Sequence, residues 1–135
     1  MKKTLLLSLV VIITLAACKK DKVKDVTEIS LKGKWTVQST LIKHFDNNVL
    51  VDSYTIPGNG AIFDFQTNGS VVMTHDGVVE SHPYNIQGSK VDIDGDINEI
   101  RNLTASSVTL FLRDEYSPSE YVEFLQDCRH GLLFR

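Results

Sequence analysis

Hydrophobic residues follow two different patterns along this chain of 135 residues. The first is an almost purely apolar run from Leu5 to Ala17, preceded by Lys2 and Lys3. A helix of this length would measure roughly 20 Å, too short to cross a hydrocarbon core of about 30 Å. A basic start, a short apolar core and small residues at its end are typical of a cleaved secretory signal. Residues 1–17 are therefore predicted to be a signal peptide that takes no part in the fold.

The second pattern starts near Lys34, where short runs rich in β-branched and aromatic residues alternate with polar positions. Side chains of a strand point alternately to its two faces, so every second residue of the first strand should share a face. The residues expected on that face are Trp35, Val37, Ser39 and Leu41. Tight turns are predicted at Asn47-Asn48, Asn68-Gly69 and Asp76-Gly77. Further strands are predicted over residues 50–56, 61–66, 70–75, 78–86, 90–93, 97–103 and 108–113.

No gap between these runs has room for a crossover helix, so neighbouring strands are predicted to pair antiparallel. Open sheet edges invite aggregation, and a series of eight or nine short strands favours closure of the sheet on itself. The predicted fold is therefore all-β: an antiparallel up-and-down meander that closes into a barrel of about eight or nine strands within residues 31–135. The large residues expected to point inward are Leu41, Phe63, Phe65, Ile93 and Leu110.

The end of the signal, Leu15-Ala16-Ala17-Cys18, resembles the lipobox of bacterial lipoproteins. The resemblance implies transfer of diacylglycerol to the Cys18 thiol, cleavage just before it, and acylation of the new amino terminus by a fatty acid such as palmitate. Several acyl chains on one residue hold a protein to a membrane almost irreversibly. The alternative is an ordinary signal peptide followed by a coincidental cysteine. Cleavage after residue 17 leaves a mature chain of 118 residues, enough for one domain.

The residues after the cysteine bear on which membrane holds the protein. Lys19 is not the aspartate that bacterial sorting rules associate with retention in the inner membrane. Lys19-Lys20-Asp21 partly resembles the short charged signals by which Bacteroidetes-type bacteria export lipoproteins to the cell surface. We therefore expect an outer-membrane lipoprotein of the cell envelope, with the leaflet left open. Residues 18–30 then comprise the lipidated cysteine and a polar, flexible tether that reaches about 20 Å.

Three segments resemble the small lipocalin-like domains of Gram-negative lipoproteins. They are residues 31–39, "LKGKWTVQS", with the Gly33-x-Trp35 opening of lipocalins, residues 63–71, "FDFQTNGSV", and residues 97–112, "INEIRNLTASSVTLFL". The resemblance implies a lipocalin-like barrel whose closed end is plugged by Trp35, often with an arginine over the ring. Arg113 and Arg129 are the candidates for that cation–π contact, and plain core packing of Trp35 is the alternative.

The end of the chain carries conflicting local signals. Ser117-Pro118-Ser119-Glu120 fits a capping box with proline at the first helical position, which favours a helix. Residues 120–126, "EYVEFLQ", are rich in β-formers, and the lipocalin resemblance implies a last strand there. The strand is the favoured interpretation.

The charge of the body excludes one class of partner. After Leu31 the chain holds eight Lys and Arg against fourteen Asp and Glu, whereas nucleic-acid binding needs a dense positive surface. No phosphate loop, nucleophile elbow or paired-cysteine metal motif is present, so neither enzymatic activity nor a cofactor is expected.

Two stretches, one rich in aspartate and one containing two histidines, are candidate metal sites. "DIDGDIN", residues 92–98, has its glycine at the fourth position, where a calcium loop of the EF-hand type needs it at the sixth. A three-residue turn at residues 94–96, placing Ile93 opposite Ile97 and Asp92 opposite Asn98, explains the spacing without metal. The second stretch holds His75, Glu80 and His82. A turn at Asp76-Gly77 would place His75 opposite Val78 and Met73 opposite Glu80, so the two histidines would lie far apart. No metal is therefore expected.

With Cys18 acylated, Cys128 has no cysteine to pair with, so no internal disulfide is expected. A packed thiol is favoured over a catalytic one activated by the neighbouring His130.

Two functions remain open. The first is a binding protein that holds a small lipophilic molecule in the barrel or at its mouth. The second is a non-enzymatic structural or protein-interaction lipoprotein with a filled barrel and a protein partner that the sequence does not name. For the binding function, Phe63, Phe65 and Met73 are the candidate apolar contacts. The polar groups expected to fix a head group are Tyr54, Glu80, His82 and Tyr84, three of which share one face of a strand. The alternative is an outward polar stripe with Tyr84 in the core.

Overall fold

The computed structural model describes residues 31–131, which form nine β-strands joined by short loops. The predicted signal peptide, the Cys18 anchor and the tether lie outside the described residues. Within the part of the chain that the structure describes, no helix is long and apolar enough to span a membrane. The strands are β1 (Gly33–Asp46), β2 (Val49–Pro57), β3 (Ile62–Phe65), β4 (Ser70–His75), β5 (Val78–Gln87), β6 (Lys90–Ile93), β7 (Asp96–Arg101), β8 (Ser107–Ser117) and β9 (Glu120–His130).

All neighbouring strands pair antiparallel, and the pairing of β1 with β9 closes the sheet. One edge of β1 is shared: its first residues, 33–36, pair with β3, and residues 39–46 pair with β2. The closed barrel therefore consists of β1 and β3–β9, and β2 is an extra strand. The predicted all-β antiparallel barrel is confirmed. The predicted last strand is confirmed as well, since β9 pairs with both β1 and β8.

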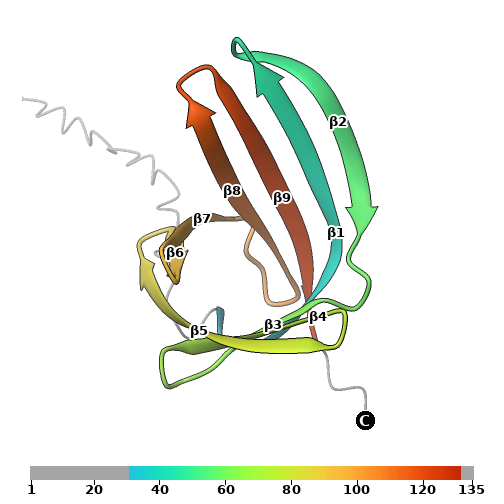
Figure 1. Ribbon diagram of the computed structural model, residues 1–135. Helices are drawn as coiled ribbons and strands as arrows, with labels where there is room; N and C mark the ends of the chain where they lie inside the picture. Colours follow the sequence, from blue (N-terminus) through green and yellow to red (C-terminus); the bar gives the residue numbers. More distant parts are fainter. Residues whose placement is uncertain (1–30, 132–135) are drawn as a thin grey trace, which may run out of the picture.

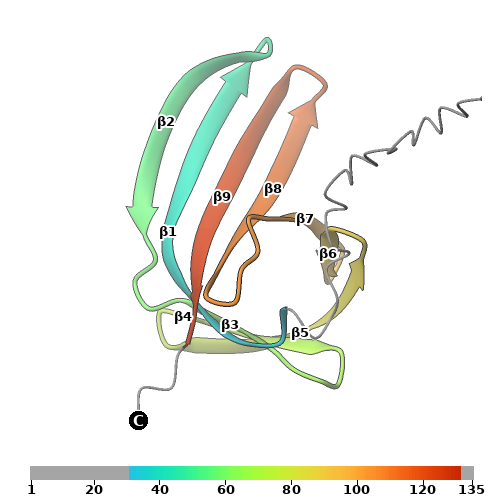
Figure 2. The ribbon, with the colours of Figure 1, turned by 180° about the vertical axis from the view of Figure 1, so that it is seen from behind.

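Four strands project beyond the rest of the barrel at one end. Figures 1 and 2 show β8, β9, β1 and β2 rising as a curved sheet above the ring that β3–β7 complete. Every residue of β2 is exposed. We call this end, where β2 and β3 part, the mouth of the barrel. The opposite end is closed by side chains.

Trp35 fills the closed end. Its side chain is 1% exposed, and its indole Nε1 donates a hydrogen bond to the carbonyl oxygen of Leu31 at 2.7 Å. The ring of His130 meets it edge-on, with the ring centroids 4.7 Å apart. Gly33 has a φ of 106°, and a Cβ there would lie 2.8 Å from Nε2 of His130, so a glycine is needed at this position.

Neither candidate arginine lies over Trp35, so the alternative, core packing of Trp35, is the one that the structure has. Arg113 lies over the ring of Tyr121 at 4.3 Å and donates to Glu123 at 2.7 Å, because its register on β8 places it in the projecting sheet. Arg129 is paired with Thr36, the neighbour of Trp35 along β1. Neighbouring residues of a strand point to opposite faces, so Arg129 lies on the face away from Trp35.

Four of the five predicted inward residues, Phe63, Phe65, Ile93 and Leu110, are buried, but Leu41 is not among the buried residues. The register of β1 against β9 shifts between Val37 and Ser39, which makes Gln38 the extra residue of a β-bulge. Beyond the bulge, Thr40 and Ile42 are the buried positions. The predicted face of Trp35, Val37, Ser39 and Leu41 is therefore correct only for its first two members.

The hairpin between β6 and β7 also differs from the predicted register. Asp94 and Gly95 both have positive φ, 53° and 98°, and form a two-residue turn. Ile93 consequently pairs with Asp96, and Val91 with Asn98. Since paired residues share a face, this register directs Asp96 and Asn98 to the inner face of the barrel and leaves Ile97 outside, 56% exposed.

Candidate functional site

Two adjoining cavities lie at the mouth of the barrel. The acidic cavity has a volume of about 250 Å³ and is lined by Phe63, Met73, His82, Ile93, Asp94, Asp96, Asn98, Leu112 and Gln126. The apolar cavity measures about 370 Å³ and is lined mainly by Val37, Ile42, Ile56, Pro57, Ala61, Ile62 and Phe124, with Thr40, Gly58, Thr74 and His75 as its other contacts. Phe63, Met73 and Gln126 line both, so the two form one site, which we call the mouth groove.

The apolar cavity exists because β2 leaves the barrel. Its wall is the loop after Pro57, and that loop packs on the bulge of β1. Gly58 donates its N–H to the carbonyl of Gln38 at 2.9 Å, and Val37 donates to the carbonyl of Ala61 at 2.9 Å. A Cβ on Gly58 would come within 1.8 Å of the Val37 carbonyl oxygen, so the approach of the two backbones requires a glycine.

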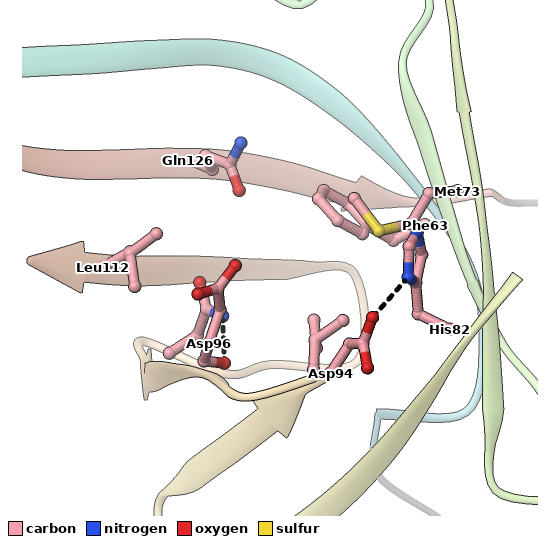
Figure 3. Close-up of a pocket in the computed structure, with 9 residues that line it drawn as sticks. Phe63, Met73, His82, Asp94, Asp96, Leu112 and Gln126 are labelled. Atoms are coloured by element: carbon pink, nitrogen blue, oxygen red, sulfur yellow. Dashed lines mark hydrogen bonds and ion pairs between the residues drawn. The ribbon is translucent and has the colours of Figure 1, made fainter. Parts of the chain in front are cut away.

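The acidic cavity holds a histidine between two carboxylates. Nδ1 of His82 lies 3.2 Å from Oδ2 of Asp94, and its Nε2 lies 3.4 Å from Oε2 of Glu80. Figure 3 shows the contact between His82 and Asp94, with Phe63 and Met73 beside the histidine. Hydrogen bonds from the ring to Asp94, and then to Glu80, raise the pKa of His82 above its usual value of 6.5.

Asp96 supplies a further carboxylate. Its backbone carbonyl accepts a hydrogen bond from Nδ2 of the buried Asn98 at 3.1 Å. Among the described residues, no ion pair involves the Asp96 carboxylate, and neither Lys nor Arg lines the cavity. In Figure 3, Asp96 lies away from His82, on the side of the cavity where Leu112 of β8 and Gln126 of the neighbouring β9 are drawn. The polar end of the groove is therefore rich in negatively charged hydrogen-bond acceptors.

The raised pKa of His82 predicts a pH-dependent stability. A histidine whose pKa is higher in the folded state contributes stability that is fully present below pH 6.5 and is lost as the pH rises through the folded-state value. The replacement Asp94→Asn should lower the pKa of His82 and weaken this dependence, as followed by the imidazole proton resonances in an NMR titration. Asp127→Asn, on the outer face of β9, is the matched control and should leave the titration unchanged. An equal pKa of His82 in Asp94→Asn and wild type would contradict the assignment.

The structure brings together some of the predicted ligand contacts and separates others. Phe63 and Met73 line both cavities, His82 lines the acidic one, and Glu80 contacts His82 from an exposed position at the rim. Phe65 and Tyr84 instead belong to the buried core. Their rings meet edge-on at 5.1 Å, and the Tyr84 hydroxyl donates to the carbonyl of Gln66 at 2.7 Å.

Tyr54 lines neither cavity, although it shares a face of β2 with Ile56 and pairs with Ile42. It stands on β2, 45% exposed, and stacks on His44 with the ring centroids 5.9 Å apart. Its place follows from β2 forming an extra strand of the projecting sheet, outside the closed barrel.

Sequence reasoning missed the carboxylates and amides of the groove. Asp94 and Asp96 were expected in a three-residue turn, a register that pairs Ile93 with Ile97 and not with Asp96. A two-residue Asp-Gly turn at residues 94–95, the type predicted elsewhere in the chain, would have paired Asp96 with Ile93 and so placed it on the inner face. Gln126 had no such signal, because its inward position depends on the pairing of β9 with residue 40 beyond the bulge.

The remaining candidates for chemistry are structural. Cys128 is buried at the closed end, and burial raises the pKa of its thiol to about 12, so the folded protein holds it protonated at neutral pH. His130 contacts Trp35, on the strand beside it. His75 pairs with Val78 and Met73 with Glu80, as predicted. Over residues 31–131, no cluster of three or more His, Cys, Asp or Glu side chains could hold a metal ion.

The mouth groove is thus the place where apolar walls and unneutralised polar groups meet. Its lining comes from all nine described strands and from the turns between them, so the whole barrel positions it. Comparison of the chain with protein-family models, with curated proteins and with solved structures found no match.

Proposed function

We propose that this chain is a lipid-anchored, lipocalin-like binding protein that holds a small lipophilic molecule in the mouth groove. The observation that carries the proposal is the apolar cavity of about 370 Å³. Ligand sites typically measure about 300–1,000 Å³ and combine apolar walls with a few polar groups. The adjoining acidic cavity supplies such groups through His82, Asp96 and Gln126.

The energetics explain why both cavities matter. A ligand with about 300 Å² of buried apolar surface gains on the order of 7 kcal/mol from the hydrophobic effect. Association costs of about 4 kcal/mol or more leave only weak binding from this term, roughly in the millimolar to micromolar range. Polar contacts at one end of the groove are therefore needed for useful affinity and for orientation of the ligand.

The groove can be tested with a pair of substitutions on β2. Ile56 lines the apolar cavity and is 43% exposed, so Ile56→Glu should place a charge in the cavity at little cost to folding. Thr55 is exposed and points to the opposite face, which makes Thr55→Glu the matched control. We expect Ile56→Glu to weaken binding of a fluorescent lipophilic probe at least about tenfold, corresponding to roughly 1.4 kcal/mol.

The measurement is a fluorescence titration of the mature chain carrying Cys18→Ala, so that no attached acyl chain can fill the groove. Native mass spectrometry of the same protein, purified without detergent, shows whether a molecule is retained. The proposal is wrong if no lipophile binds or raises the melting temperature, or if Ile56→Glu and Thr55→Glu bind the probe equally well.

The membrane location has its own test, which rests on Leu15-Ala16-Ala17-Cys18. In the full-length precursor, Cys18→Ala should abolish acylation and move the protein from the membrane to the soluble fraction. Metabolic labelling with a fatty-acid analogue and fractionation of the cell envelope measure both effects. Continued labelling and sedimentation of Cys18→Ala with the membranes would rule out the anchor.

One observation favours the second function, a module for protein interaction. β2 is an edge strand with every residue exposed, and Val49, Leu50 and Val51 are between 48% and 62% exposed. Edge strands of soluble proteins are commonly protected by lysine or a bulge. β2 carries no lysine, and its one bulge, at Val51, lies within this exposed apolar run. If the groove binds no lipophile, strand pairing at β2 becomes the function that the geometry supports.

A further inference from the structure

We infer that the mouth groove selects a cationic amphiphile: a molecule with one aliphatic chain and an amine or quaternary ammonium head group. This inference rests on the proposed binding function and adds the class of ligand. The aliphatic chain would occupy the apolar cavity between Ile42, Ile56 and Phe124, and the head group would lie in the acidic cavity near Asp96.

The shape of the site supports a ligand with two unlike ends. The two cavities differ in lining, since Asp94, Asp96 and His82 occur only in one, and Ile42, Ile56 and Phe124 only in the other. They meet at Phe63 and Met73, so an apolar chain and a polar head can be bound at once without burying the head in apolar surroundings. A purely hydrophilic cation would leave the larger cavity unused.

The charge of the acidic cavity determines which head group fits. His82 lies between Asp94 and Glu80 and offsets part of their charge. Even with His82 fully protonated, its single positive charge stands against the three carboxylates of Glu80, Asp94 and Asp96. The Asp96 carboxylate takes part in none of the ion pairs of the described residues and is therefore available as a counterion.

The neutral lining of the same cavity suits a cation as well. The face of Phe63 can attract an ammonium group through its ring electrons, an interaction that is strongest for groups with little bound water. The side-chain oxygen of Gln126 can accept a hydrogen bond from an amine. An anionic head group would instead meet Asp94 and Asp96 with no Lys or Arg in the lining to neutralise it, which provides selectivity by repulsion.

The net negative charge of the protein also favours binding of a cation. The body of the protein after Leu31 has eight basic against fourteen acidic residues, so its field draws cations and repels anionic amphiphiles. This contribution is long-ranged and falls with salt, whereas the contact with Asp96 is local. The two contributions can therefore be separated by one substitution at the site and one elsewhere.

The experiment compares three amphiphiles with the same twelve-carbon chain: dodecyltrimethylammonium, dodecanoate and a neutral dodecyl polyoxyethylene ether. Each is titrated below its micelle concentration into the mature chain carrying Cys18→Ala, by calorimetry at low and moderate salt. We expect a stoichiometry of one, and we expect the cation to bind at least about tenfold more tightly than the neutral ether, with dodecanoate the weakest.

Two variants locate the head group. Asp96→Asn removes the charge but keeps the backbone carbonyl that Asn98 contacts. The affinity for the cation should therefore fall to within about threefold of the affinity for the neutral ether, and the affinity for the ether should not change. Asp127→Asn removes one exposed charge on the outer face of β9, next to Gln126 along the chain, and should preserve the cation preference.

The outcomes separate this inference from the proposed function. If all three amphiphiles bind with similar affinity, or dodecanoate binds best, the groove is a lipophile site and the cationic ligand class is rejected. If none binds, both are rejected. A preference for the cation that survives Asp96→Asn, or that Asp127→Asn removes equally, also overturns the inference, because the selectivity would then come from overall charge and not from the acidic cavity.

Discussion

Replacing Trp35 by alanine is expected to lower the free energy of unfolding by about 3–5 kcal/mol, in the range for a large buried aromatic residue. The side chain is 1% exposed, and its removal would leave a void at the closed end, among Leu31, Val37 and Phe65. It would also remove the hydrogen bond to the Leu31 carbonyl and the edge contact with His130. Urea unfolding followed by circular dichroism measures the change as a shift of the midpoint.

Tyr116→Ala serves as the control for this prediction. Tyr116 is also a large aromatic residue, but it is 68% exposed near the end of β8. Its removal should shift the midpoint little. If Trp35→Ala and Tyr116→Ala gave similar midpoints, Trp35 would not close the barrel. The substitution Trp35→Phe keeps the apolar ring but removes the Nε1–H donor, so it should have an intermediate effect.

Gly58→Ala is expected to have the second large effect, a loss of about 3 kcal/mol or more. The added Cβ would lie 1.8 Å from the carbonyl oxygen of Val37, a backbone atom that cannot rotate away. The loop must therefore move off the bulge and lose the hydrogen bonds of Gly58 to Gln38 and of Val37 to Ala61. Because that loop is a wall of the apolar cavity, binding of lipophiles should weaken at the same time.

Gly60→Ala, in the same loop, is the matched control. Gly60 has a φ of 76°, and no atom lies within 4 Å of a Cβ built there, so only backbone strain of about 1–2 kcal/mol is expected. Chemical denaturation and probe binding are measured for both variants. They compare the steric clash of Gly58→Ala with the backbone strain of Gly60→Ala. A smaller loss of stability in Gly58→Ala than in Gly60→Ala would contradict the close packing of the loop on β1.

Local sequence was sufficient for the strands and most of the turns. Asn47 and Asn48 both adopt positive φ, 51° and 60°, as their predicted turn requires. The pairing across Asp76-Gly77 is the predicted one as well. These features depend on the conformational preferences of a few neighbouring residues and on the alternation of side chains along a strand. Neither changes when distant parts of the chain are added.

The mouth groove could be predicted only in part. Phe63, Met73 and His82 were found because each lies on a regular strand, paired without a bulge, whose inward face follows from alternation. Tyr54 was misplaced because nothing local shows that β2 leaves the barrel. Asp96 and Gln126 were missed because their positions depend on the exact length of one turn and on one extra residue in β1.

The sequence alone determined that the chain is an antiparallel β-protein of about nine strands, with Phe63, Phe65 and Trp35 in its interior. The tertiary structure alone decided where the sheet closes, where it splays, and which polar groups face the opening. Closure joins β1 to β9 across most of the chain, and it requires one register that satisfies both edges of β1. The bulge at Gln38 adjusts that register and reverses the inward face of the rest of β1, because strand side chains alternate with a period of two.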